Sequence, residues 1–178
     1  PGATDRSMDL TFNEASHEYA VGGNPVHGVS KILHPAGLID LTWIDEEAMK
    51  RGTFIHQTIE YYLRGELDED SLDPRLAGYL AAFKKAQAEV GFSALHGDNG
   101  PLVEHRVFHP ILRYAGTVDM VVTFGGSPIV VDLKSGAPDD WHAWQLALYA
   151  LTFTKNHVLR ANLYVREDGT YRWIQRND

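Results

Sequence analysis

The spacing of apolar residues changes near the middle of the chain, from a helical period of three to four to an alternating period of two. In the first part, this spacing predicts helices, because positions three and four apart share one helix face. Gly52 interrupts the longest pattern, so we expect either one helix there or two. The expected helices are Val29–Leu33, Asp45–Leu63, ended by Gly65, and Pro74 to about Val90, ended by Gly91.

The second part alternates as half-buried strands do. A loosely alternating segment, Leu10–Val21, also predicts a small hairpin at the start of the chain. The expected later strands are Leu102–His109, Tyr114–Phe124, Ile129–Lys134, Ala161–Arg166 and Tyr171–Gln175, with a strong helix over Asp140–Lys155. This order predicts an α/β fold of mixed α+β character, in which a central mixed, largely antiparallel sheet is flanked by helices.

Length and composition narrow the class of protein. We expect one domain over residues 8–178, and we interpret residues 1–7, which precede Met8, as an added or disordered tail. The chain has no cysteine, which excludes disulfides, zinc-thiolate sites and an iron–sulfur cluster. No apolar run is long enough for a membrane span and no signal peptide is visible, so we expect a cytoplasmic protein without a membrane partner.

The net charge of −8 argues against a protein that coats nucleic acid, since such proteins are normally basic. It still allows an enzyme that contacts phosphates through a local basic strip, because clustered acids at a metal site also lower the net charge. The charge therefore directs attention to where the acids lie.

Two acids lie within the predicted hairpin formed by Tyr114–Phe124 and Ile129–Lys134. If Gly125-Gly126 is a two-residue turn, counting back along the strands places Asp119 directly opposite Asp132. Two carboxylates in that position repel each other and destabilise a sheet. A divalent cation such as Mg²⁺ between them would remove the repulsion, so this hairpin predicts a metal site.

Alternation also places Lys134 on the same strand face as Asp132. A lysine beside a metal site can orient or deprotonate a water molecule and stabilise charge that develops on a phosphate. The alternative is a structural ion cluster, in which Lys134 only neutralises the neighbouring acid.

Further polar residues share helix faces or lie on the preceding strand. His56 lies four residues before Glu60, and Gln145 lies four residues before Tyr149, so each pair shares one face of its helix. Glu104 lies on the strand before the hairpin, and a third acidic ligand is what a divalent site would use. Each has an ordinary alternative: a surface or core histidine, a core tyrosine with a hydrogen-bonded amide, or an exposed strand carboxylate.

Taken together, the order of these residues resembles the PD-(D/E)XK nuclease superfamily, and within it the RecB-type exonucleases, which include phage and mitochondrial genome-maintenance exonucleases. The segment Val26–Leu33 also resembles the opening motif of phage-encoded members. Val118 and Asp132 depart from the proline and glutamate frequent at these positions in the superfamily. The matching motifs are Gly52-Thr53-x-x-His56, Glu104, Gly116-Thr117-x-Asp119, Asp132-x-Lys134 and Gln145-x-x-x-Tyr149.

The resemblance implies a restriction-endonuclease-like core and assigns roles to the residues. Lys134 would position or activate the attacking water, and His56 would contact metal or phosphate. One or two Mg²⁺ or Mn²⁺ ions would be held by Asp119, Asp132, the backbone carbonyl of Leu133, His56 and, as a further ligand, Glu104. DNA would be contacted by Gln145, Tyr149, Arg51 and Thr53.

The function that the resemblance implies is a Mg²⁺-dependent DNA exonuclease of bacterial or phage origin. It would act on single-stranded DNA or DNA ends in recombination, repair or phage DNA metabolism, together with a recombination or helicase partner protein. Two alternatives remain open. One is a non-catalytic DNA-binding factor on a nuclease fold, and the other is an endonuclease of restriction or junction-resolving type.

Overall fold

The computed structural model describes residues 9–39, 45–153 and 158–176. The predicted tail, residues 1–7, and the predicted end of the helix at Lys155 lie outside this part. Within it, no helix is long and apolar enough to cross a membrane. The helices are α1 (Val29–Leu33), α2 (Glu46–Arg64), the short 3₁₀ turn η1 (Glu69–Ser71), α3 (Pro74–Ala86), the π-helical turn η2 (Gln87–Gly91) and α4 (Trp141–Leu151).

The sheet confirms the predicted mixture of strand directions. Its strands run in the order β1-β2-β3-β8-β9-β10-β11, with β4 and β7 also pairing with β8. The pairs β3–β8 and β9–β10 are parallel, and the other pairs in this sheet are antiparallel. The strands are β1 (Leu10–Asn13), β2 (Glu18–Val21), β3 (Asn24–Gly28), β4 (Phe92–Ala94), β7 (Val103–His109), β8 (Tyr114–Phe124), β9 (Ser127–Lys134), β10 (Leu159–Val165) and β11 (Tyr171–Arg176), with a separate small hairpin of β5 (His96–Gly97) and β6 (Gly100–Pro101).

Helix α2 is one continuous helix, so Gly52 does not divide it. The side chain of Asp45 accepts a hydrogen bond from the Glu47 N–H at the first turn, as an N-cap residue does. Gly65 ends the helix in the left-handed conformation, with φ of 73°. The continuity of α2 matters for the site, because its middle turns place His56 near Asp119 of β8.

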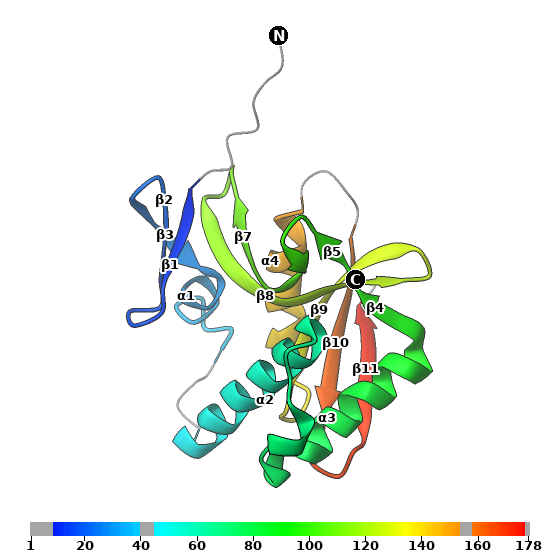
Figure 1. The fold of residues 1–178 in the computed structure, drawn as a ribbon. Coiled ribbons are helices and arrows are strands. Elements are labelled where there is room, and N and C mark those ends of the chain that lie inside the picture. Colours follow the sequence, from blue (N-terminus) through cyan, green and yellow to red (C-terminus); the bar gives the residue numbers. More distant parts are fainter. Residues whose placement is uncertain (1–8, 40–44, 154–157, 177–178) are drawn as a thin grey trace.

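Helices cover both faces of the sheet (Figure 1). Helices α2 and α3 pack on one face, where Ile129, Val131 and Leu133 belong to the larger apolar cluster. Helices α1 and α4 pack on the other face, where Val130 belongs to the second cluster. The predicted alternation of β9 is therefore confirmed, and it directs Asp132 and Lys134 towards α4.

Sequence analysis did not predict β3, β4, β5 or β6. These strands have two to five residues, too few to show a period. Strand β3 contains Pro25 and follows two glycines, which is typical of a turn. It still matters for the site, because its parallel pairing with β8 attaches the β1–β2 hairpin to the main sheet.

Candidate active site

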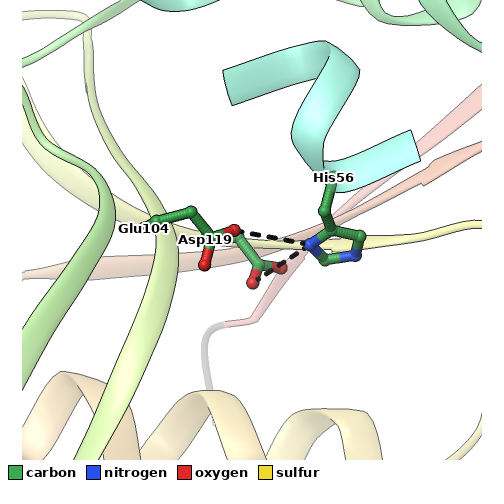
Figure 2. Close-up of side chains that lie close together, drawn as sticks. All are labelled: His56, Glu104 and Asp119. Atoms are coloured by element: carbon green, nitrogen blue, oxygen red, sulfur yellow. Dashed lines mark ion pairs between the residues drawn. The ribbon is translucent and has the colours of Figure 1, made fainter. Parts of the chain in front are cut away.

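Three side chains from separate elements converge at the middle of the sheet (Figure 2). The Nδ1 atom of His56, on α2, lies 3.7 Å from Glu104 Oε1 of β7 and 3.5 Å from Asp119 Oδ1 of β8. One potential ligand atom from each residue lies within 4.8 Å of the others. The three side chains are between 14% and 34% exposed, so the cluster is partly open to solvent. We call this set the metal cluster.

An irregularity shared by β7 and β8 creates the metal cluster. Glu104 and Asp119 stand at the same level of the ladder, between the pairs Val103–Met120 and His105–Val118. Glu104 has a φ of 45°, which is uncommon for a residue with a side chain.

The irregularity also changes which side chains face each helix layer. Val118 and Met120 are two residues apart, yet Met120 packs in the cluster under α2 and Val118 in the cluster under α4. A regular strand would place both on one face. The break in alternation lets Asp119 reach His56 on the α2 side.

The predicted register of β8 and β9 holds from the turn as far as the pair Met120–Val131. The next pair, Asp119 opposite Asp132, is not part of the ladder, so the prediction that they face each other as ladder partners is wrong. Instead, the Leu133 N–H donates a hydrogen bond of 2.6 Å to Asp119 Oδ2. The carboxylate takes the position of a backbone acceptor, and the strands part at this point.

The charges of the metal cluster depend on one another. Burial alone would lower the pKa of His56, but the carboxylates of Asp119 and Glu104 outweigh it and raise that pKa to about 10. Burial raises the pKa of Glu104. Although burial opposes it, His56, Lys134 and the Leu133 N–H lower the pKa of Asp119. The His56 proton therefore places a positive charge between the two carboxylates.

A second polar group lies behind the metal cluster, between β9, β10 and α4, and it is largely buried. Lys134 Nζ donates to Asp132 Oδ1 at 2.8 Å and to Gln145 Oε1 at 3.0 Å. Asn162 Nδ2 donates to Asp132 Oδ2 at 2.9 Å. The side chain of Asp132 is only 2% exposed. Burial, together with the nearby charge of Asp119, raises the pKa of Asp132 to about 6 although Lys134 opposes this. We call this set the buried network.

Helix α4 completes the buried network. Gln145 Nε2 donates to the Tyr149 hydroxyl at 3.2 Å, so the predicted pair does share one helix face. The Tyr149 ring lies against Gly116, where an added Cβ would come within 2.5 Å of Tyr149 Cε1. Gly116 is therefore required by the close approach of this ring to β8.

A family model described as "PD-(D/E)XK nuclease superfamily" matches residues 35–172, which is most of the chain. The chain belongs to the PD-(D/E)XK nuclease superfamily. No curated protein matches it. A solved structure described as "Crystal structure of SSO0001" is similar, with 15% sequence identity and a TM-score of 0.35, covering 83% of this chain and 74% of the other.

Membership in this nuclease superfamily gives DNA as the substrate and a divalent cation as the typical cofactor. The metal cluster fits such a cation by its donor set, because two carboxylates and an imidazole are ligands that divalent ions accept and their atoms already converge. Asp132 is turned to Lys134 and Asn162 instead. The structure thus brings together three of the predicted metal ligands and places Asp132 in the adjoining network.

The nuclease groove lies over the metal cluster. It is a cavity of about 1230 Å³, lined by α2, β7, the β1–β2 hairpin and the β5–β6 turn. Thr53 lines it, one turn before His56 on α2. Arg51 does not, and instead lines a separate cavity with Asp73 and Arg75. The structure therefore does not bring Arg51 to the other predicted residues.

Sequence analysis missed Asn162 and Arg176. Asn162 is fully buried on β10, level with Asp132 in the parallel ladder. Its Oδ1 accepts a 2.9 Å hydrogen bond from Arg176 Nε of β11, which fixes the orientation of the amide. The available signal was an amide inside the apolar segment Ala161–Val165, where a polar side chain requires a partner.

Proposed function

We propose that this chain is a metal-dependent DNA exonuclease that hydrolyses phosphodiester bonds, with Mg²⁺ or Mn²⁺ as the cation. The observation that carries the proposal is the metal cluster itself: three ligand side chains converge, two of them line the groove, and a lysine held in the buried network lies behind them. A phosphodiester entering the groove would meet His56 and Glu104, with Asp119 and Lys134 behind them.

Each residue of the site would have a separate role in hydrolysis. His56, Glu104 and Asp119 would hold the cation, with Asp132 and the Leu133 carbonyl as further ligands once the cation is bound. The cation supplies Lewis acidity, which stabilises charge on the phosphate and on the leaving oxygen. Lys134, fixed by Asp132 and Gln145, would orient the attacking water, and Tyr149 and Thr53 would contact the DNA strand.

The decisive experiment uses end-labelled single- and double-stranded DNA with Mg²⁺, Mn²⁺ or EDTA, with products resolved by length. We expect wild-type protein to release short products from the ends only when a cation is present. Asp119→Asn should reduce the rate by about a thousandfold or more, since it removes a charged ligand from the cluster. Glu66→Gln changes an exposed acid outside the groove and is the matched control.

Two outcomes would overturn the proposal. Equal rates for Asp119→Asn and wild type, after careful purification, would show that the hydrolysis does not come from this site. DNA binding without cation-dependent hydrolysis would instead identify a non-catalytic DNA-binding factor.

The exonuclease assignment rests on the set of His56 with Gln145 and Tyr149, which resembles the RecB-type branch. Covalently closed circular DNA tests it against the endonuclease alternative. An exonuclease leaves the circle intact while it degrades the same DNA after linearisation. Cleavage of the circle would assign a restriction-like or junction-resolving activity. A role in recombination, repair or phage DNA metabolism, with a helicase or recombination partner, belongs to the same proposal.

A further inference from the structure

The groove that starts at the metal cluster has an aromatic wall at its other side. Phe12, His17 and Tyr19 of the β1–β2 hairpin line the same cavity as His56 and Glu104. The Phe12 ring centroid lies 4.6 Å from that of Tyr19 and 5.7 Å from that of His17. Aromatic rings beside a nucleic-acid groove are surfaces on which bases stack. We call these three residues the hairpin wall.

The hairpin wall is fixed in position relative to the metal cluster. The Tyr19 hydroxyl hydrogen-bonds Thr117 Oγ1 at 2.8 Å, and Thr117 lies two residues before Asp119 on β8. Strand β3, which continues from the hairpin, pairs with the start of β8. A nucleotide whose phosphate lies at the cluster would therefore meet a wall held by the catalytic strand itself.

The charges along the groove favour recognition of bases over recognition of phosphates alone. Arg106 is exposed and its guanidinium lies 5.6 Å from the centre of the Phe12 ring, which places one cation beside the rings. Glu14 and Asp98 line the same groove and oppose a purely electrostatic attraction for DNA. With this mixed lining, stacking has to supply a substantial part of the affinity.

We propose that the hairpin wall stacks against the bases of an unpaired DNA strand and so selects single-stranded substrate next to the metal cluster. This inference rests on the proposed nuclease function and names its substrate. An unpaired strand is required because a duplex covers the faces of its bases everywhere except at its ends. Arg106 contacts the backbone of the same strand.

Fluorescence anisotropy in EDTA tests the proposal without hydrolysis. The ligands are a labelled oligothymidylate of twelve nucleotides and an abasic oligomer with the same number of phosphates. We expect Phe12→Leu to weaken binding of the oligothymidylate by about tenfold, as loss of a stacking ring does, and to leave binding of the abasic oligomer unchanged. Tyr61→Leu removes an exposed aromatic ring of α2 outside this groove, and is the matched control that should change neither.

A second variant keeps the test independent of folding. His17 is exposed and has a φ of 50°, a conformation that asparagine tolerates, so His17→Asn removes a ring without backbone strain. Equal weakening for both ligands, or no weakening in either variant, would overturn the proposal. So would wild-type protein that binds a closed-ended duplex as tightly as the oligothymidylate.

The readout separates this inference from the proposed function. Base-dependent binding that requires Phe12, in a protein that hydrolyses nothing, would retain the hairpin wall and overturn the nuclease assignment. Normal hydrolysis by Phe12→Leu, with unchanged binding of both ligands, would retain the nuclease assignment and overturn the role of the hairpin wall.

Discussion

The metal cluster and the buried network lie on adjoining strands but differ in how completely their polar groups are paired. In the buried network, each oxygen of Asp132 accepts a hydrogen bond, one from Lys134 and one from Asn162. In the metal cluster, two carboxylates share a single imidazole at distances of 3.5 Å and more. The carboxylates of the metal cluster can therefore accept a cation, whereas each oxygen of Asp132 in the buried network already has a hydrogen-bond partner. This contrast assigns the first binding of a cation to the metal cluster and the positioning of Lys134 to the buried network.

The largest loss of stability should follow from a substitution in the buried network. Lys134→Met removes the ammonium that neutralises Asp132, and a buried charge left unpaired costs about 3 kcal/mol of unfolding free energy or more. Urea unfolding of the variant and of wild type measures this difference. Asp119→Asn, in the metal cluster, keeps an oxygen that can accept from the Leu133 N–H and leaves Glu104 paired with His56, so it should cost less. Equal losses of unfolding free energy in the two variants would contradict the distinction between the metal cluster and the buried network.

Cation binding at the metal cluster should stabilise the folded protein. At a free Mn²⁺ concentration about 100 times the dissociation constant, ligand binding adds about 2.7 kcal/mol to the unfolding free energy. Thermal unfolding with and without Mn²⁺ should therefore show a higher Tm for wild type. Glu104→Gln should reduce the Tm increase strongly, while Glu66→Gln should leave it intact. A Tm increase that survives loss of Glu104 would place the cation elsewhere.

The packing behind the buried network should tolerate little added volume. Gly116→Ala places a methyl group against the Tyr149 ring, and overpacking of this kind costs about 2 kcal/mol. Gly52→Ala is the matched control for stability, because nothing lies within 4 Å of its added Cβ and alanine favours a helix. Chemical denaturation should show a loss for the first variant and none for the second.

The smallest effect should come from Asn162. Asn162→Leu removes the donor to Asp132 and the acceptor for Arg176, and unsatisfied buried partners cost about 1–2 kcal/mol. If Asn162 orients Asp132, DNA hydrolysis should fall through kcat with little change in KM. Asn162→Ser, which keeps a hydroxyl donor, should recover part of the rate. A change in stability alone would make Asn162 a structural residue.

The periodicity of the sequence predicts the parts of the site that lie on regular elements. Alternation along β9 places Asp132 and Lys134 on one face, and helical spacing places Gln145 beside Tyr149, as the structure confirms. These predictions succeed because a regular strand or helix fixes the direction of each side chain.

Periodicity fails where the elements become irregular. The positive φ of Glu104 and the change of face between Val118 and Met120 violate the alternation that the register argument assumes. The predicted ladder therefore extends one pair beyond the observed one, to Asp119 opposite Asp132. The contact of Asn162 with Asp132 depends on a parallel pairing of strands distant in sequence, which no local pattern encodes.

The connection from β9 through α4 to β10 has a consequence for how the protein folds. The buried network lies within this one strand–helix–strand unit and the adjoining β11, and its Asp132–Asn162 contact spans 30 residues. The metal cluster needs His56 to meet Asp119, from helix and strand segments much farther apart along the chain. Short-range contacts form faster than long-range ones. We therefore expect the lysine to be held in place before the ligands assemble, and cation binding would then report the final docking of α2 onto the sheet.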